Sequence, residues 1–433
     1  MIPEVLAHTV SYVLSLDTAS FIRVFWFFII FDFPRNILGD LYILFYSLTH
    51  KSEKNEREKE FLSELEKRPP LISVIIPALN EEATIGWTIR SLQEQSYQNL
   101  ELIIVDDGSD DKTPEICRSL SHAPNVNYYR FEQRAGKSAV LNYGLKHAHG
   151  EYIIFVDSDT TFDRDAIFKL MAAFADPKVG GASGNLRARN AHANLLTVLQ
   201  QAEYIFSISI GRRIRARLGI LPIISGAFGG FRRDLIALDA IGGHEPGPGN
   251  DSDLAIRVRK KGYRIVFIPE ANCLTNVPEK MNKLIKQRQR WDRNIVKNRI
   301  RKHKNVFNPF SRNFKVLDSI SFIDSIFFHV ILAAVSIYYV IDLTLNHPDY
   351  LIQILLINYI LYLTAEIFEM IIAVLLSGHK KDLLIILYLP LLNPYKMFLK
   401  VNRLIAYAQE LFFYASNRDP FAPSKVQSRM IQW

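Results

Sequence analysis

The sequence predicts an α/β domain with a mostly parallel β-sheet, flanked by N- and C-terminal transmembrane helices and amphipathic interface helices. Three observations predict this fold. Apolar residues concentrate at the two ends of the 433-residue chain, whose apolar fraction of 49% is high for a soluble protein. In the central region, short β-branched runs alternate with segments of helical periodicity, as in βαβ units. Polar residues follow directly after these runs, where a parallel sheet places its ligands.

The length suits two or three domains, and changes in composition divide the chain further. We expect a globular cytosolic domain at its centre, over residues 71–292. The segments expected around it are an N-terminal membrane segment at 1–50, a charged connector at 51–70, a basic amphipathic interface segment at 293–318, C-terminal transmembrane and interface helices at 319–415, and a tail at 416–433.

The first apolar segment, residues 21–48, is long enough to cross a membrane once, since about 20 residues span the hydrocarbon core. Asp32, Arg35 and Asp40 interrupt it. We favour one kinked helix whose polar positions face other helices; the alternative is two short apolar pieces lying in the membrane interface. A signal peptide is not expected, because no short apolar core is followed by a small-residue cleavage site.

Near the C-terminus, residues 320–343 and 351–376 are two clear candidate spans, and residues 383–399 are a shorter one that Pro390 and Pro394 interrupt. Basic residues flank these spans on one side only. The positive-inside rule therefore predicts an integral protein of the cell (plasma) membrane whose catalytic or binding domain is cytoplasmic. The sequence leaves open whether the last segment crosses the membrane or lies in its interface, and hence the side of the C-terminus.

The net charge of +8 would suit nucleic acid on charge alone, but the Lys and Arg residues cluster beside the apolar segments. The expected partner is therefore the lipid bilayer and not nucleic acid. The two cysteines, Cys117 and Cys273, provide neither a zinc-binding pair nor a disulfide framework, which favours a reducing compartment.

Two β-branched runs, residues 72–76 and 100–105, flank a segment of helical periodicity and predict a βαβ unit. Polar residues follow both strands at the edge where a parallel sheet binds its ligand. They are Asn80, Glu81, Asp106 and Asp107. The alternative for the acidic run DDGSDD is a turn rich in helix-capping residues.

Residues 152–156 predict a third buried strand, which leads directly into Asp157 and Asp159. Alternate residues of an extended chain share a face, so these carboxylates point the same way. They are candidate ligands for a divalent cation that carries a diphosphate, and Lys137, at the start of the preceding helix, is placed to meet phosphate. The alternative is a solvated turn, because D-x-D is a common sequence.

The segment GNDSDLAIRVRKKG predicts a helix that begins with acids and ends at Gly262. Asp251 or Asp253 is either its N-cap or a general base that deprotonates a sugar hydroxyl, and periodicity does not decide between these roles. The preceding GGHEPGP is expected to be a flexible loop that closes over substrate, with His244 a loop residue rather than a catalyst.

The run KQRQRWDRNIVKNRIRKHK places Trp291 among cationic side chains. On a helix, Gln287, Arg290 and Trp291 share one face, with Arg288 at its border. This face offers an aromatic ring on which a sugar can stack and donors for a diphosphate. The alternative is a basic amphipathic helix on anionic lipid, which suits residues 297–304.

Taken in order, the motifs VDDGS, GKSAVLN, DSD, SGAFGGFRRD, NDSD and QRQRW resemble those of the membrane-integrated processive glycosyltransferases of family 2. These include the hyaluronan, chitin, cellulose and poly-N-acetylglucosamine synthases. The resemblance covers residues 72–291 and the flanking spans; each motif alone is weak, whereas the ordered set is specific. It implies a GT-A-type nucleotide-sugar-binding domain at 71–292 and a UDP-sugar-dependent hexosyltransferase. Q-x-x-R-W is similar to the signature of polymerising members.

The resemblance also implies a role for each matching residue. Glu81, Asp106 and Asp107 would hold the uridine, Lys137 would meet the diphosphate, and Asp157 and Asp159 would coordinate Mg2+ or Mn2+. Ser225, Gly226 and Phe228 would form the wall against which the acceptor sugar lies. Asp251 would be the catalytic base. Gln287, Arg288 and Arg290 would clamp the diphosphate, and Trp291 would stack on the acceptor terminus.

The sequence departs from the family pattern at Asn250, where many members have an acid before the base. This departure puts the assignment of Asp251 in doubt and makes Asp253 the second candidate.

The implied activity is an in-line displacement that converts an α-linked UDP-sugar into a β-linked polymer and extrudes the polymer across the membrane. UDP-N-acetylglucosamine is the favoured donor and UDP-glucose the next, the growing polysaccharide is the acceptor, and any regulation would need an accessory subunit. One alternative is a non-processive transferase that moves one sugar onto a lipid phosphate. Another is a catalytically silent scaffold or export component, which Asn250 favours.

Overall fold

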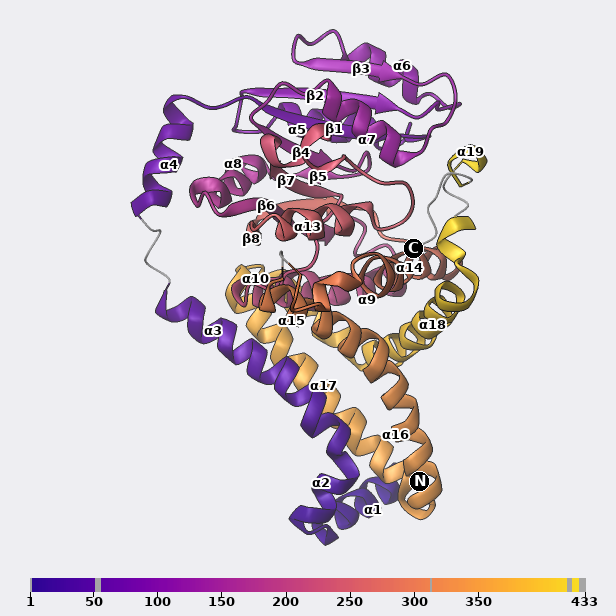
Figure 1. The fold of residues 1–433 in the computed structure, drawn as a ribbon. Helices are drawn as coiled ribbons and strands as arrows, with labels where there is room; N and C mark the ends of the chain where they lie inside the picture. Colours follow the sequence, from indigo (N-terminus) through magenta and orange to yellow (C-terminus); the bar gives the residue numbers. More distant parts are fainter. Residues whose placement is uncertain (1, 51–55, 312–313, 419–422, 428–433) are drawn as a thin grey trace. The chain divides into compact units, whose positions relative to one another are not determined.

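The computed structural model describes residues 2–50, 56–311, 314–418 and 423–427 (Figure 1). The chain divides into two compact units. Unit 1 comprises Met1–Ser52 and Ser325–Leu404, and unit 2 comprises Glu53–Asp324 and Ile405–Trp433. Residues 51–55 of the expected connector, 312–313 of the expected interface segment, and 419–422 and 428–433 of the expected tail lie outside the described residues.

Unit 2 contains an eight-stranded sheet in the order β3-β2-β1-β4-β7-β6-β8-β5. The strands are β1 (Ile72–Ala78), β2 (Leu100–Asp106), β3 (Val126–Arg130), β4 (Tyr152–Val156), β5 (Thr161–Phe162), β6 (Val179–Ala188), β7 (Phe228–Arg232) and β8 (Arg264–Thr275). β1 to β4 pair in parallel, whereas β7 is antiparallel to both of its neighbours. β8 is parallel to β6 and antiparallel to β5. The expected parallel α/β arrangement is therefore confirmed for the half of the sheet that holds the predicted strands, and the other half is mixed.

Helices surround this sheet. Those wholly within unit 2 are α4 (Glu56–Lys67), α5 (Ile85–Gln93), α6 (Thr113–Leu120), α7 (Lys137–Lys146), α8 (Ala166–Met171), η3 (Ala172–Ala175), α9 (Leu195–Tyr204), η4 (Ile205–Ile210), α10 (Gly211–Arg217), α11 (Arg233–Ile236), α12 (Leu238–Ile241), α13 (Asn250–Lys260), α14 (Met281–Asn294), η5 (Ile295–Lys302), η6 (Lys304–Phe307), η10 (Ala415–Arg418) and α19 (Ser424–Gln427). The helix expected after β1 and the acid-rich helix expected at 249–262 are α5 and α13.

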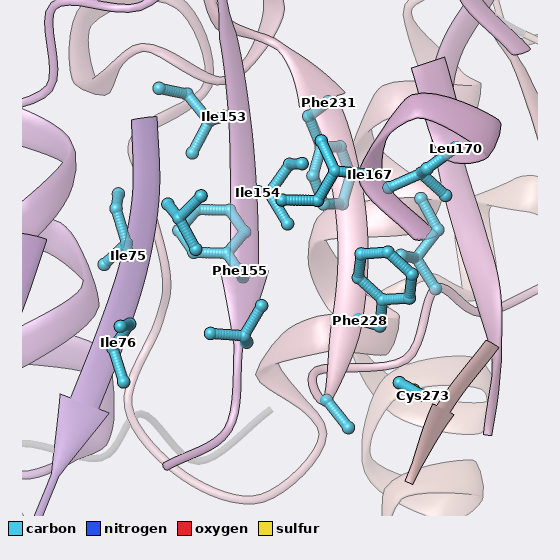
Figure 2. Close-up of a cluster of buried hydrophobic side chains, with 14 of the residues drawn as sticks. Ile75, Ile76, Ile153, Ile154, Phe155, Ile167, Leu170, Phe228, Phe231 and Cys273 are labelled. Carbon is cyan, nitrogen blue, oxygen red and sulfur yellow. The ribbon is translucent and has the colours of Figure 1, made fainter. Parts of the chain in front are cut away.

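The core of unit 2 is formed by β-branched and aromatic side chains of the central strands (Figure 2). Ile75 of β1 and Leu170 of α8 are both fully buried. At Gly144 of α7 an added Cβ would lie 2.5 Å from a methyl carbon of Ile75, so α7 packs closely on β1. Cys117 and Cys273 are free and buried.

Unit 1 is helical in its described residues. Its elements are α1 (Ile2–Ser15), α2 (Thr18–Phe27), η1 (Phe28–Asp32), η2 (Pro34–Leu38), α3 (Gly39–Thr49), η7 (Phe327–Ile331), α16 (Leu332–Asn346), η8 (Pro348–Tyr350), α17 (Leu351–Ser377) and η9 (Lys380–Leu391), together with parts of α15 (Val316–Ile326) and α18 (Leu392–Phe413). Three described stretches are long and apolar enough to cross a membrane: Val316–Asn346, Pro348–Ser377 and Lys380–Phe413. The helices Ala7–Ser15 and Thr18–Thr49, which meet at an angle of 116°, would together be a fourth.

The polar positions of the N-terminal apolar segment face protein. The hydroxyl of Tyr362 donates a hydrogen bond to Asp32, and the Arg35 guanidinium lies 4.4 Å from the centre of a phenylalanine ring in η7. Asp40 is only 1% exposed. Residues 18–49 form one helical run whose polar positions contact protein. That this run crosses the membrane stays a prediction.

The basic run that follows Trp291 continues the same helical segment, because α14 leads directly into η5. Asn298, Arg299 and His303 in this run are at most 5% exposed. The sequence predicted a membrane surface over 293–318, but the structure packs these three side chains against protein. A membrane contact for the rest of the segment stays a prediction.

Candidate active site

Asp157 and Asp159 follow β4 and lie close enough to influence each other. The Lys137 ammonium, at the first residue of α7, contacts Asp157 Oδ1 at 2.5 Å. Asp159 accepts hydrogen bonds from Thr160 and Thr275, both at 3.2 Å. Burial, together with the negative charge of Asp157, raises the pKa of Asp159. The pair therefore favours a positive charge between its carboxylates.

These two carboxylates fit a divalent cation. Magnesium-like ions commonly take one or two protein carboxylates and complete their shell with water and substrate phosphates. Among the described residues, no group of three or more His, Cys, Asp or Glu side chains has the arrangement of a metal site. The protein alone would thus provide an open site, with hard oxygen donors, that needs a diphosphate to complete it.

Glu81 lies nearer to these acids than the sequence implied. Its carboxylate accepts a hydrogen bond from Thr84 Oγ1 at 2.6 Å. Burial raises the pKa of Glu81, and the charges of Asp159 and Asp157 act in the same direction. Glu81 therefore lies within electrostatic reach of the D-x-D acids, and its contact with uridine stays a prediction.

Asp106 is a structural residue. Its carboxylate is completely buried and accepts hydrogen bonds from Ser109 Oγ at 2.6 Å and Tyr128 Oη at 2.8 Å. These bonds hold the carboxylate at the end of β2, and the contact of Asp106 with uridine stays a prediction. Asp107 accepts from the backbone N–H groups of Ala135 at 2.6 Å and Gly136 at 3.1 Å. It ties the end of β2 to the start of α7.

Asp251 lies in the first turn of α13, beside Lys137. Its oxygens accept hydrogen bonds from the backbone of Ser252 at 2.8 Å and Gly226 at 3.3 Å. A Cβ added at Gly226 would be 3.6 Å from Asp251 Oδ2 and 3.8 Å from Lys137 Nζ. The missing side chain of Gly226 therefore leaves a space bordered by a carboxylate and an ammonium.

The electrostatics of Asp251 suit a base. Burial raises the pKa of its carboxyl, although the Ser252 hydrogen bond and the Lys137 charge oppose this shift. Arg212 of α10 adds a second nearby cation, since it interacts electrostatically with Asp251, and burial lowers the pKa of Arg212 to about 10. A carboxylate with a raised pKa among cations can hold a proton and release it again.

Asp253, the second candidate for the base, is surrounded by cationic and hydrogen-bonding partners. It is 2% exposed. Its carboxylate oxygens lie 2.8 Å from His303 Nε2, 2.5 Å from Lys302 Nζ and 2.9 Å from Arg257 Nε. Burial would raise its pKa, but the His303 hydrogen bond and the charges of Arg257 and Lys302 outweigh burial and lower the pKa well below the usual range. A carboxylate that is held in its ionised form by three partners is a poor proton acceptor.

Asn250 and the residues of the expected acceptor wall, Ser225 and Phe228, differ in how they relate to the site. The Asn250 side chain accepts from the Asp251 backbone at 3.0 Å and donates to Ser138 at 3.4 Å, so it positions the helix start. Ser225 borders the site and is 8% exposed. Phe228 was expected to face the acceptor, but it is 0% exposed, with its ring 4.9 Å from that of Phe162. It supports the wall from within the core.

Trp291 on α14 is 41% exposed, so its ring is available to a ligand. The Arg288 guanidinium lies 4.4 Å from the centre of that ring and donates to Glu203 at 2.9 Å. Arg288 was expected to clamp a diphosphate; the structure instead makes it a support beneath Trp291. Arg290 interacts electrostatically with Lys137, which brings a second cation toward the D-x-D acids. Gln287 Oε1 is buried and has no hydrogen-bond partner among the described residues.

Sequence reasoning missed three polar residues that the structure brings to the site. Arg189 donates to the backbone of Asp159 at 2.9 Å and so fixes the D-x-D turn. Glu203 anchors Arg288, and Arg212 lies near Asp251. Each acts through a partner distant in sequence, so no local motif could have identified it.

Comparisons with known proteins show which families and proteins this chain resembles. Residues 73–238 match the family model for glycosyl transferase family 2, and residues 251–403 match the model for chitin synthase. The chain is 32% identical over 263 residues to poly-beta-1,6-N-acetyl-D-glucosamine synthase of Staphylococcus aureus (strain COL), covering 59% of this chain and 60% of that protein. It is 34% identical over 223 residues to the Staphylococcus epidermidis protein of the same name, covering 51% and 53%. The chain thus matches less than two thirds of the length of these curated relatives.

A solved structure shares the fold. It is the mannosyltransferase PcManGT from Pyrobaculum calidifontis, in complex with GDP-Man and Mn2+, with a TM-score of 0.55 and 20% identity. The match covers 88% of this chain and 96% of that one. At this identity the likeness shows a GT-A-like fold.

Proposed function

We propose, from the premise that residues 73–238 are a family 2 glycosyltransferase domain, that this chain is a processive inverting β-glycosyltransferase. It polymerises a UDP-sugar, with UDP-N-acetylglucosamine favoured and UDP-glucose next, and extrudes the polysaccharide across the membrane. The names of the staphylococcal relatives support polymer synthesis and the N-acetylglucosamine donor.

The observation that carries the proposal is the convergence of three groups. Lys137 contacts Asp157 at 2.5 Å. Gly226 lies beside Lys137 and Asp251, and a Cβ added there would meet Lys137 Nζ at 3.8 Å and Asp251 Oδ2 at 3.6 Å, so the site has room for a small group. A transferase needs a base for the acceptor, cationic charge for the leaving diphosphate, and room for the acceptor between them. Residues from α7, the turn after β4, α13 and the turn before β7 would meet these requirements.

The transfer step follows from this arrangement. The acceptor hydroxyl lies in the space at Gly226, where Asp251 removes its proton. The oxygen forms a bond to the anomeric carbon while the bond from that carbon to the β-phosphate oxygen breaks. Lys137 and Arg290 stabilise the departing UDP. Because attack and departure are on opposite sides, an α-linked donor gives a β-linked product.

Asp157 and Asp159 would hold Mg2+ or Mn2+, whose charge offsets that of the departing diphosphate. The Mn2+ in the PcManGT complex supports a divalent cation in this fold. Asp107 remains the proposed contact for the uridine, at the end of β2.

Trp291 supports repeated transfer. Its exposed ring, stiffened by Arg288 and Glu203, gives the newly added sugar a surface on which to stack before the next cycle. The candidate spans, with the basic flanks of the apolar segments, support an integral cell-membrane protein whose catalytic domain is cytoplasmic. The polymer would then leave through unit 1.

The test uses the full chain purified into nanodiscs with Mn2+. UDP release is measured from UDP-N-acetylglucosamine, UDP-glucose and UDP-glucuronate, singly and in pairs, and any polymer is sized. We expect a long product from UDP-N-acetylglucosamine alone. Trp291→Ala is expected to shorten that product by about fivefold, since stacking on an aromatic ring contributes roughly 1 kcal/mol.

The matched control is Trp87→Ala, because Trp87 is also exposed, at 63%, but lies on α5. It should leave product length unchanged. UDP release without polymer would instead indicate a single-transfer enzyme acting on a lipid phosphate. UDP binding without release from any donor would indicate a silent scaffold.

Gly226 provides a steric test of the acceptor space. Gly226→Ala is expected to fold normally, since the added Cβ meets its neighbours at 3.6 to 3.9 Å, ordinary contact distances. The methyl group would nevertheless occupy the acceptor space, so kcat should fall by about 10- to 100-fold. The control is Gly86→Ala on α5, whose added Cβ would meet Ile116 at 3.7 Å. Unchanged kcat in Gly226→Ala would place the acceptor elsewhere.

A further inference from the structure

The segment 242–249, which contains the predicted flexible loop GGHEPGP (242–248), is hydrogen-bonded to α7. The His244 backbone N–H donates to Asn142 Oδ1 at 2.6 Å, and the Asn142 amide donates back to the His244 carbonyl at 2.9 Å. Ser138 Oγ donates to the Glu245 carbonyl at 2.7 Å. His244 is buried, and burial lowers its pKa to about 3, so it stays neutral. The segment is held in place in this structure and does not stand away as an open lid.

The same segment is fastened on its other side to η5. Asn298 donates to the Gly249 carbonyl at 2.9 Å, and Lys297 donates to the Pro246 carbonyl at 3.1 Å. Gly249 has a φ of +80°, and an added Cβ there would lie 2.1 Å from Asn294 Oδ1. The chain therefore enters α13 tightly against the helical segment that also carries Trp291.

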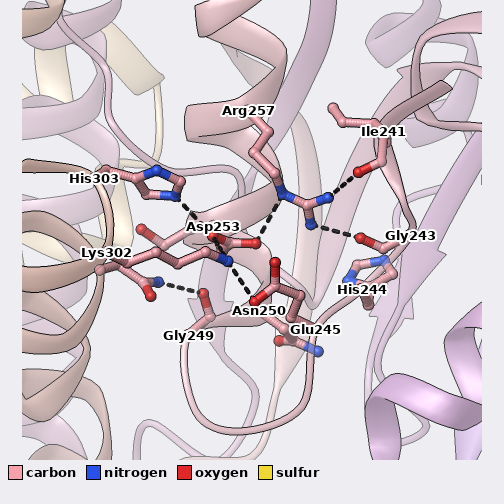
Figure 3. Close-up of polar contacts among 12 residues, drawn as sticks. Ile241, Gly243, His244, Glu245, Gly249, Asn250, Asp253, Arg257, Lys302 and His303 are labelled. Atoms are coloured by element: carbon pink, nitrogen blue, oxygen red, sulfur yellow. Dashed lines mark hydrogen bonds and ion pairs between the residues drawn. The ribbon is translucent and has the colours of Figure 1, made fainter. Parts of the chain in front are cut away.

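A buried ionic cluster joins these parts, and we call it the Asp253 cluster: Asp253, Arg257, Lys302 and His303 (Figure 3). Arg257 donates to the carbonyls of Ile241 and of Gly243, the latter at 2.5 Å. Lys302 contacts both Asp253 at 2.5 Å and Glu245 at 2.6 Å. Its side chain is 6% exposed, so these contacts are shielded from water. Lys302 is thus the one member that bridges α13, the 242–249 segment and η5.

The start of α13 depends on this support. Its N-cap is Gly249, which has no side chain to cap the helix. Asp251 is two residues from Asp253 in the same helical turn, so a shift of Asp253 or of the preceding segment moves Asp251 as well. Lys302 does not touch the acceptor space described above. Its influence on the reaction must pass through Asp251.

We propose that Lys302 is a positioning residue for the transfer step: by bridging Asp253 and Glu245, it holds Asp251 in register with the helix that carries Arg290 and Trp291. The proposal rests on the proposed function for its kinetic consequence, but not for its structural one. Without Lys302, Asp253 keeps Arg257 and His303, so the fold persists while the 242–249 segment loses its contact to η5 through Glu245.

The test compares Lys302→Met, Lys302→Arg and the control Lys304→Met in the full chain in nanodiscs. Lys304 is an exposed lysine two residues away. Lys302→Met is expected to lower kcat for UDP release by about 10- to 100-fold, with KM for the donor within about twofold. Lys302→Arg should recover most of kcat, and Lys304→Met should resemble wild type. Glu245→Gln, which alters a side chain that is 38% exposed, tests the same bridge with less risk to folding and should also lower kcat.

Backbone amide hydrogen exchange over 242–252 gives a readout that does not need activity. Exchange should rise in Lys302→Met and in Glu245→Gln, but not in Lys304→Met. If wild type releases no UDP from any donor, the proposed function is wrong, and increased exchange would still support the bridge. Unchanged kcat with a lowered melting temperature, or unchanged exchange over 242–252, would overturn the positioning role.

Discussion

Replacing Asp251 with asparagine is expected to lower kcat for sugar transfer by about 10²- to 10⁴-fold, the usual contribution of a general base. Asparagine has nearly the same size and can still accept a hydrogen bond from Gly226 or Ser252, so UDP binding and the melting temperature should change little. What it lacks is a site for the acceptor proton. The measurement is UDP release at saturating donor and Mn2+, alongside UDP binding by titration calorimetry.

The dependence on pH separates Asp251 from its neighbours. Its pKa is raised above the ordinary value of 3.8, so the carboxyl takes up a proton at higher pH than an exposed aspartate does. Only the ionised form accepts the acceptor proton. Wild-type kcat should therefore fall as the pH drops through a value above 3.8, and the residual activity of Asp251→Asn should lose this limb.

Two further variants complete this test. Asp239→Asn changes an exposed aspartate on α12 and should behave as wild type. Asp253→Asn weakens the Asp253 cluster and should lower kcat, but it should keep the acid limb, because Asp251 is still present. An acid limb that disappears in Asp253→Asn and persists in Asp251→Asn would reverse the assignment.

The strands that the sequence revealed and those it did not reveal differ in composition. β1, β2 and β4 are β-branched runs buried on both faces, and a hydrophobic run between polar residues is enough to predict such a strand. β6 and β7 are rich in glycine, which has a low propensity for strands. Their glycines are needed for close packing: a Cβ at Gly184 would lie 2.1 Å from a ring carbon of Phe228. β6 and β7 therefore had no local signal.

The residues of the candidate site also divide into those that the sequence could identify and those that it could not. Residues that follow directly after a strand, such as Asp157 and Asp159, could be predicted because a parallel sheet gathers those positions at one edge. The choice between Asp251 and Asp253 as the base could not be predicted from the sequence. It depends on contacts of Asp253 with Lys302 and His303, about fifty residues further along the chain. The support of Trp291 likewise depends on Glu203, 85 residues before Arg288. Such contacts are properties of the tertiary fold and leave no periodicity in the sequence.

Replacing Asp159 with asparagine is expected to lower kcat by about 10²-fold or more, comparable to the loss of one electrostatic stabiliser of a transition state. Asp159 is partly buried, and its partners, Thr160 and Thr275, can bond equally well to an amide. The variant therefore removes charge with little change in structure. Chelation of divalent ions in wild type should give a loss of similar size, and added Mn2+ should restore wild type but not the variant.

Binding of UDP provides a measurement of this site that is independent of turnover. UDP affinity in wild type should rise when Mn2+ is added, because the diphosphate completes the shell that two carboxylates leave open. In Asp159→Asn the Mn2+-dependent gain should be lost, whereas Asp165→Asn, an exposed acid at the start of α8, should keep it. Since burial and Asp157 raise the pKa of Asp159, protons compete with the cation at higher pH than for an ordinary aspartate, so the gain should shrink on acidification. If UDP binds equally well with and without Mn2+ in wild type, the D-x-D acids serve only to hold Lys137, and that lysine must carry the diphosphate without a metal.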